Sequence, residues 1–167
     1  MKSLEIFTKN NVETKKIGGL LAKETIRSRT SNSNNALVIS LEGDLGAGKT
    51  TFTQGFARGL GVKEVPKSPT FMILQIYDIK LGVNKNPRSR KSVDREGFKN
   101  FIHVDAYRLE SKDFKVLNWD NFVKDKKNII LVEWGNKIKN ILPKNSLRIT
   151  FGHIGRSGHL RLIKVYK

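Results

Sequence analysis

The sequence predicts an α/β protein in which a mixed central sheet lies between two layers of helices. Three observations lead to this prediction. Two continuous apolar runs, at 36–43 and 128–134, have the length and composition of buried strands. A stretch with helical spacing of apolar residues precedes the first run, and another follows it. Residues 146–167 contain two strand patterns separated by a short turn, which is typical of an antiparallel hairpin.

The first third of the chain begins with a short strand candidate at 4–8. Asn11 then offers a helix cap, and apolar residues recur with helical spacing across 12–28. A polar linker at 28–35 ends this helix. The strand at 36–43 follows and leads directly into a glycine-rich loop.

The segment after that loop, residues 50–62, predicts a second helix that ends at Gly61. Two strands are expected at 71–79 and 100–107, because both stretches are rich in β-branched and aromatic residues. Short helical pieces are expected within 110–126. The strand at 128–134 and the closing hairpin, with its turn at 155–158, complete a three-layer domain that spans residues 1–167.

Length and composition restrict the class of protein further. A chain of 167 residues is long enough for one domain with a substantial core. The chain has no cysteine, which excludes disulfides and thiolate metal sites. No apolar run reaches the roughly 18 residues of a membrane span, and the first residues lack the apolar core of a secretory signal. We therefore expect a soluble cytoplasmic protein without a membrane partner.

The formal net charge of +17 is compatible with nucleic-acid binding, because cations release counterions from phosphate backbones. Basic residues nevertheless occur along most of the chain, as in a general lysine-rich surface. The densest stretch, 80–100, has seven cations and two acids and no periodicity, which predicts an inserted loop. Stacking aromatics are nearly absent from it, and this argues against a dedicated single-strand groove.

The glycine-rich loop carries the clearest chemical signal. Residues 43–50 read GDLGAGKT, a complete G-x-x-x-x-G-K-S/T phosphate loop between a strand and a helix. Such a loop points backbone N–H groups at a β-phosphate, its lysine contacts the β- and γ-phosphates, and its hydroxyl binds Mg²⁺. The predicted nucleotide-binding residues here are Gly43, Asp44, Leu45, Gly46, Ala47, Gly48, Lys49, Thr50 and Thr51.

A nucleotide-bound Mg²⁺ requires a further protein oxygen, usually from an acid at the end of a neighbouring buried strand. Asp105 and Glu133 both occupy such positions, and each is a candidate metal ligand. We expect that one of them binds the metal and the other positions a water.

Two other classes of nucleotide-binding protein require further sequence features. Guanine specificity is disfavoured, because DREG at 94–97 follows no apolar strand and NKIK at 136–139 has lysine where guanine recognition needs aspartate. A small metabolite kinase remains the alternative function, with 80–100 as an arginine-bearing lid.

Four motifs together resemble one family. GDLGAGKTTFTQGFARGLGV, KSPTFMIL, HVDAYRL and LVEW, in this order and spacing, resemble the TsaE (YjeE) ATPases. The resemblance runs from about residue 12 to the carboxyl terminus. It implies a P-loop NTPase-like fold, ATP and Mg²⁺ as cofactors, and ATP hydrolysis that serves N6-threonylcarbamoyladenosine synthesis in tRNA. It also implies TsaD and TsaB as partner proteins, with any contact to tRNA more indirect.

The resemblance assigns roles to the residues that match these motifs. Lys49 and Thr50 would contact phosphate and Mg²⁺, Glu133 would be the second metal ligand, and Asp105 would be the acid essential for hydrolysis.

The resemblance also implies nucleotide contacts outside the phosphate loop. Ser68 and Thr70, on either side of Pro69, would form a switch-like loop near the γ-phosphate. Trp134 would flank the nucleotide, and Thr14 matches a position near the adenine. For Trp134 a packing role, and for Thr14 an ordinary place in the first helical turn, are the alternatives.

The chain departs from the family pattern in three places. Gly135 and Asn136 follow VEW, where proline or serine and then glutamate are common. The acidic stretch after YRL is reduced to ESKDFKVL at 110–117, and the loop at 80–100 is longer and more basic than is typical.

Overall fold

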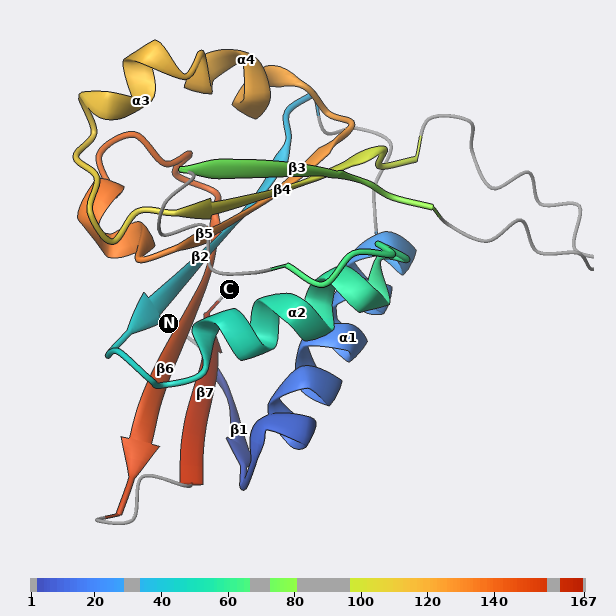
Figure 1. Ribbon diagram of the computed structural model, residues 1–167, viewed down its shortest axis with the longest axis vertical. Coiled ribbons are helices and arrows are strands. Elements are labelled where there is room, and N and C mark those ends of the chain that lie inside the picture. Colours follow the sequence, from blue (N-terminus) through green and yellow to red (C-terminus); the bar gives the residue numbers. More distant parts are fainter. Residues whose placement is uncertain (1–2, 29–33, 67–72, 81–96, 156–159, 167) are drawn as a thin grey trace, which may run out of the picture.

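The computed structural model describes residues 3–28, 34–66, 73–80, 97–155 and 160–166 (Figure 1). Its strands are β1 (Ser3–Thr8), β2 (Leu37–Gly43), β3 (Leu74–Asp78), β4 (Asn100–Asp105), β5 (Asn128–Glu133), β6 (Leu147–Ile154) and β7 (Leu160–Tyr166). Its helices are α1 (Asn11–Arg27), α2 (Lys49–Gly59), α3 (Asp113–Val116), α4 (Trp119–Lys124) and the 3-10 turn η1 (Gly135–Ile138).

All seven strands belong to one mixed sheet with the order β1-β7-β6-β2-β5-β4-β3. The four central strands β4, β5, β2 and β6 are parallel to one another. The pairs β3–β4, β6–β7 and β1–β7 are antiparallel. The predicted mixed sheet and the predicted closing hairpin are therefore both confirmed.

Helices cover both faces of the sheet, as expected for three layers. Helices α1 and α2 lie on one face, and α3 and α4 lie on the other (Figure 1). The sheet separates two hydrophobic cores. One includes Phe52 and Phe56 of α2 against Leu41, and the other includes Phe114 and Trp119 under α3 and α4.

The contact between α1 and α2 is unusually close because glycines form it. A Cβ on Gly55 would lie 2.0 Å from the carbonyl oxygen of Lys15, and one on Gly18 would lie 2.3 Å from that of Phe52. Close backbone approach of this kind requires glycine. The contact holds α2 against α1 on one face of the sheet.

Several predicted boundaries are corrected by the structure. The helix cap is Asn10 and not Asn11, because the Asn10 side chain accepts a hydrogen bond from the Glu13 N–H at 2.9 Å. The predicted strand 128–134 ends at Glu133, since Trp134 turns the chain with a φ of 62°. The predicted strand 100–107 likewise ends at Asp105. Among the described residues, no helix has the length and apolar character needed to cross a bilayer.

Candidate functional site

The glycine-rich loop joins the carboxyl end of β2 to the first turn of α2. Three of its glycines have positive φ: Gly43 at 131°, Gly46 at 77° and Gly48 at 102°. Residues that carry a side chain rarely adopt these backbone angles. At Gly43 there is also no room, because a Cβ would lie 2.1 Å from the carbonyl oxygen of Phe151 on β6. The loop conformation therefore depends on the glycines that form the motif.

Lys49, the first residue of α2, is folded back into the loop. Its side chain is only 5% exposed, and Nζ donates hydrogen bonds to the carbonyl oxygens of Gly43 and Asp44, each at 2.7 Å. The same Nζ lies 3.7 Å from the ring centroid of Trp134. Burial lowers the pKa of Lys49 from its ordinary value, while the carboxylates of Glu133, Asp105 and Asp44 act in the opposite direction. No carboxylate bonds directly to the ammonium in the described structure, so it is available to an anion that enters the loop.

Glu133 is the last residue of β5. It is only 2% exposed, and three side chains contact its carboxylate. Its Oε2 accepts a hydrogen bond from the Thr50 hydroxyl at 2.7 Å. Its Oε1 accepts from the Thr53 hydroxyl at 3.2 Å and lies 2.8 Å from His103 Nε2. The carboxylate thus has one oxygen anchored inside the protein and the other beside the hydroxyl of the phosphate loop.

Asp105 lies next to Glu133 because β4 and β5 pair in parallel with these two residues in register. Asp105 is 8% exposed, and its Oδ1 accepts a hydrogen bond from the Tyr107 N–H at 3.0 Å. The Tyr107 ring in turn contacts the Trp134 ring, with a centroid separation of 4.9 Å. The two acids and the two aromatic rings therefore belong to one continuous wall.

A cavity of about 240 Å³ opens between this wall and the phosphate loop. It lies at the carboxyl ends of parallel strands, where α/β proteins bind their ligands. Its lining combines residues from three separate motifs, and all of them except Tyr107 are predicted site residues: Leu45, Gly46, Gly48, Lys49, Thr50, Thr51, Asp105, Tyr107, Glu133 and Trp134.

The other predicted residues have different positions. Ala47 is fully buried beneath the loop, whereas the Leu45 side chain is 76% exposed. Thr14 is also fully buried and does not line the cavity. Ser68 and Thr70, together with Pro69 and almost all of the 80–100 loop, lie outside the described residues.

Thr14 lies on the side of the loop that faces α1 and β7. Its hydroxyl is 2.9 Å from that of Thr8 and accepts a hydrogen bond from Arg161 at 3.2 Å. The Arg161 side chain lies against Gly48, where a Cβ would be 3.2 Å from Arg161 Cδ. Thr14 is therefore placed beside the phosphate loop, and its hydroxyl is already occupied by protein groups.

Sequence reasoning missed three residues that contribute to this arrangement. They are His103, Thr53 and Arg161, none of which the sequence motifs assign to the site. Two of them had a signal in their spacing: His103 shares a strand face with Asp105 two residues later, and Thr53 follows Lys49 by one helical turn. Arg161 had no such signal, because only the pairing of β7 with β1 and β6 brings it to the loop.

This geometry has the chemical groups that suit an anion, and part of a ligand set for a metal ion. Backbone N–H groups at the start of α2 and the Lys49 ammonium favour phosphate. The Thr50 hydroxyl and the carboxylates of Glu133 and Asp105 are hard oxygen ligands of the type that Mg²⁺ prefers. No set of three or more His, Asp or Glu side chains in the described part of the chain could hold a metal alone. Phosphate oxygens would therefore have to complete the coordination.

Comparisons with known proteins agree with this architecture. The family model described as Threonylcarbamoyl adenosine biosynthesis protein TsaE matches residues 8–159. The tRNA threonylcarbamoyladenosine biosynthesis protein TsaE of Bacillus subtilis is 36% identical over 155 residues, covering 93% of this chain and 81% of that protein. Its counterpart in Haemophilus influenzae is 29% identical over 166 residues, covering 98% and 90%.

A solved structure gives the same result for the fold. The crystal structure of YdiB from Bacillus subtilis is similar to this chain with a TM-score of 0.68 and 31% sequence identity. The match covers 98% of this chain and 84% of the crystallised one.

Proposed function

The chain belongs to the TsaE family of threonylcarbamoyl adenosine biosynthesis proteins, and on this premise we propose that it is a Mg²⁺-dependent ATPase. In this proposal it acts in the cytoplasm with the TsaD–TsaB pair during N6-threonylcarbamoyladenosine modification of tRNA. The threonylcarbamoyl transfer itself belongs to the partners, and this chain supplies ATP hydrolysis between rounds of modification.

One observation carries the proposal. The phosphate loop and two buried acids from adjacent strand ends surround a single cavity, although Lys49, Asp105 and Glu133 are far apart in the sequence. A phosphate loop alone would support nucleotide binding only. The acids in register beside it support hydrolysis, because phosphoryl transfer requires a bound metal and an oriented nucleophile.

The residues present fit the phosphates of a nucleotide. In the structure the Lys49 ammonium bonds to two carbonyl oxygens, which are neutral acceptors at 2.7 Å. Phosphate oxygens are stronger, charged acceptors, so we expect the ammonium to turn toward them. Release of this contact also frees the face of the Trp134 ring for the nucleotide.

The residues also fit Mg²⁺. The Thr50 hydroxyl and Glu133 Oε2 are already 2.7 Å apart and would hold the ion jointly. The ion would neutralise charge on the β- and γ-phosphates. His103 and Thr53 keep the other Glu133 oxygen fixed, so the carboxylate is oriented before the ligand arrives.

The two acids differ in their contacts. Both line the cavity, but the Glu133 oxygens accept hydrogen bonds from the Thr50 and Thr53 hydroxyls, whereas Asp105 Oδ1 accepts one from the Tyr107 N–H. We assign Asp105 to the orientation of the attacking water, and Glu133 to the metal.

Phosphate release assays test this assignment. We expect Asp105→Asn to bind ATP as the unmodified protein does and to lose turnover, and Lys49→Ala to lose both. Asp105→Asn with full turnover would overturn the role of Asp105. Transfer of radiolabel from ATP to a nucleoside or sugar acceptor would instead support the metabolite kinase.

A further inference from the structure

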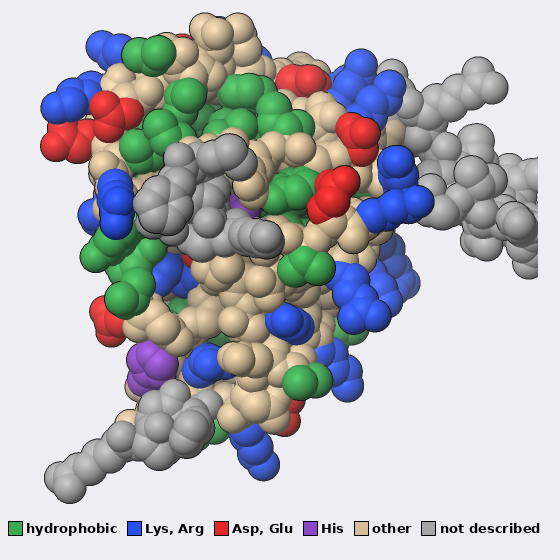
Figure 2. Space-filling view, viewed as in Figure 1, with side chains coloured by type: hydrophobic (Ala, Val, Ile, Leu, Met, Phe, Trp, Pro, Cys, Tyr) green, Lys and Arg blue, Asp and Glu red, His purple; other side chains and the backbone are tan. Residues whose placement is uncertain are grey.

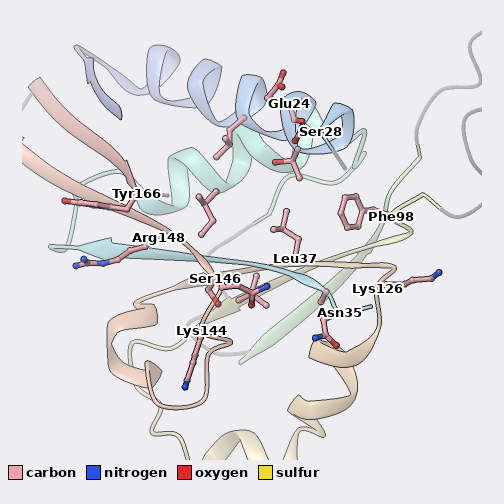
Figure 3. A pocket seen from close by; sticks show the side chains of 16 residues that line it. Glu24, Ser28, Asn35, Leu37, Phe98, Lys126, Lys144, Ser146, Arg148 and Tyr166 are labelled. Carbon is pink, nitrogen blue, oxygen red and sulfur yellow. Dashed lines mark hydrogen bonds between the residues drawn. The ribbon is translucent and has the colours of Figure 1, made fainter. Parts of the chain in front are cut away.

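A second and larger cavity, of about 610 Å³, lies at the opposite end of the sheet from the phosphate loop (Figure 3). Residues at the start of β2 and β6 form one side of it, and the last turns of α1 form another. The nucleotide site begins at Gly43, the last residue of β2, whereas this cavity is lined by Leu37, the first. The two cavities are therefore separated by the length of that strand.

The inside of this cavity is apolar and its rim is charged. Leu21, Leu37, Phe98 and Leu147 are among the residues that form its walls. Lys126, Lys144 and Arg148 lie around the opening, and among the lining residues that the structure describes Glu24 is the only carboxylate. In Figure 3 the charged ends of these three cations diverge from the centre of the cavity and from one another.

Further cations extend this rim along the same edge of the sheet. Backbone hydrogen bonds connect Ile79 to Lys99 and Lys99 to Lys127, so that Lys80, Lys99 and Lys127 lie close together. All three side chains are exposed. Figure 2 shows lysine and arginine side chains gathered along the right-hand side of the molecule, toward this edge. The nearby acids, which are Asp78, Asp125, Glu24 and the Arg148 partner Glu42 at 2.7 Å, only partly compensate this charge.

This arrangement disfavours two kinds of ligand. One carboxylate cannot hold a metal ion by itself. Diverging cations cannot close around one small anion, and in the described part of the cavity there is no glycine loop of the kind that binds nucleotide phosphates. A row of separated cations suits an extended polyanion, whose charges are also separated.

We propose that this end of the sheet binds single-stranded RNA, with the sugar–phosphate backbone along the rim cations and one unpaired base in the apolar cavity. Proteins that bind single strands combine a cationic track with an apolar or aromatic surface for bases in this way. The net charge of +17 favours an RNA partner over a basic or neutral one. The choice of RNA over an acidic protein rests on the proposed function in tRNA modification, and RNA binding is measured without ATP turnover.

Fluorescence anisotropy with labelled RNA tests the rim. The probes are an oligoribonucleotide without secondary structure, a hairpin with an unpaired loop and a blunt duplex of the same length. The double variant Lys126→Glu/Lys144→Glu is compared with Lys112→Glu/Lys115→Glu at the N-cap and third residue of α3, which changes the charge equally at exposed positions away from the cavity. We expect the first variant to bind the single strand at least about tenfold more weakly, with a salt dependence shallower by about 1–2 in slope. The α3 variant should bind as the unmodified protein does.

A cavity-filling variant tests the base. Thr25→Phe places a ring in the cavity from α1 without changing the charge. We expect it to weaken binding of the single strand and of the hairpin loop by about fivefold or more, on the scale of one lost base contact. Its salt dependence and its affinity for the duplex should not change. Thr25→Ser is the control that leaves the cavity open.

Three results would overturn the proposal. One is an equal loss of RNA affinity in the Lys112/Lys115 variant, which would show that binding depends on the overall charge of the protein and not on this cavity. Another is that the protein binds the duplex as tightly as the single strand and that Thr25→Phe weakens both by the same factor. The third is unchanged RNA binding by the Lys126/Lys144 variant together with lost binding to TsaD–TsaB, which would make this edge a protein-docking surface. Melting temperature and ADP affinity, measured for every variant, separate these results from misfolding and from failure of the nucleotide site.

Discussion

Replacement of Glu133 by glutamine separates the contribution of this carboxylate to metal binding from its contribution to the stability of the fold. Three groups contact the carboxylate: Thr50 at 2.7 Å, His103 at 2.8 Å and Thr53 at 3.2 Å. Glutamine retains one acceptor oxygen, which can face His103 and Thr53. The variant loses the charge and the oxygen that accepts from the Thr50 hydroxyl, and its –NH₂ group can only donate to that hydroxyl.

The two consequences differ in size. A hydrogen bond to a charged group contributes about 1.5–3 kcal/mol and a neutral one about 0.5–1.5 kcal/mol. Because three bonds weaken by about 1–1.5 kcal/mol each, the free energy of unfolding should fall by up to about 3–4.5 kcal/mol, and by less where the protein gains from not burying a charge. A metal ligand is lost outright, whereas changes in outer-shell partners alone weaken metal sites by about 10–100-fold. We expect Mg²⁺-dependent ADP affinity to fall at least about tenfold.

Isothermal titration calorimetry with ADP, with and without Mg²⁺, measures this effect. Glu42→Gln is the matched control, because Glu42 is also largely shielded and pairs with Arg148 at 2.7 Å, outside the nucleotide cavity. Chemical denaturation of each variant gives the stability change. The reasoning would be refuted if Glu133→Gln bound Mg²⁺–ADP as tightly as the Glu42 variant does while remaining folded.

The remaining predictions concern the surroundings of the site and the helix that carries it. Lys49→Met should abolish ADP binding but keep the fold. Because burial puts the pKa of Lys49 below its unfolded value, the unmodified protein should gain stability as the pH rises between the two values, and denaturation of Lys49→Met at alkaline pH should show a smaller gain. ADP should change the fluorescence of Trp134, as the Lys49 ammonium now 3.7 Å from its ring moves to phosphate; a spectrum unchanged at saturating ADP would contradict this movement. His103→Phe should raise the Mg²⁺ concentration needed for half-maximal ADP binding, with His103→Gln restoring part of the loss; equal behaviour of the two would show a packing role only. Gly55→Ala should destabilise the protein by about 1–3 kcal/mol in thermal or chemical denaturation, since its Cβ would lie 2.0 Å from the Lys15 carbonyl oxygen, and a neutral effect would show that α1 can move.

Much of the fold could be predicted from local patterns. The strands β2 and β5 are continuous apolar runs, and helix α1 has helical spacing and polar flanks. Boundaries were less accurate because they depend on single backbone angles, such as the positive φ at Trp134. The strand order was not predicted, since it depends on pairing between distant segments.

The site could be predicted where function requires a local motif or a strand end. The phosphate loop is contiguous, and Asp105 and Glu133 each end an apolar strand, so their roles as candidates needed no register. His103, Thr53 and Arg161 act through contacts that only the assembled sheet creates. The second cavity was equally hidden, because its lining comes from six separate segments of the chain.

Steady-state ATP hydrolysis, measured with and without purified TsaD–TsaB and with Lys49→Ala as the blank, tests the proposed function most directly. The account predicts slow, Mg²⁺-dependent hydrolysis by the protein alone and strong stimulation by the pair. Equal rates with and without the pair would contradict the proposed role in tRNA modification. Hydrolysis that persists in Lys49→Ala would contradict the nucleotide site itself.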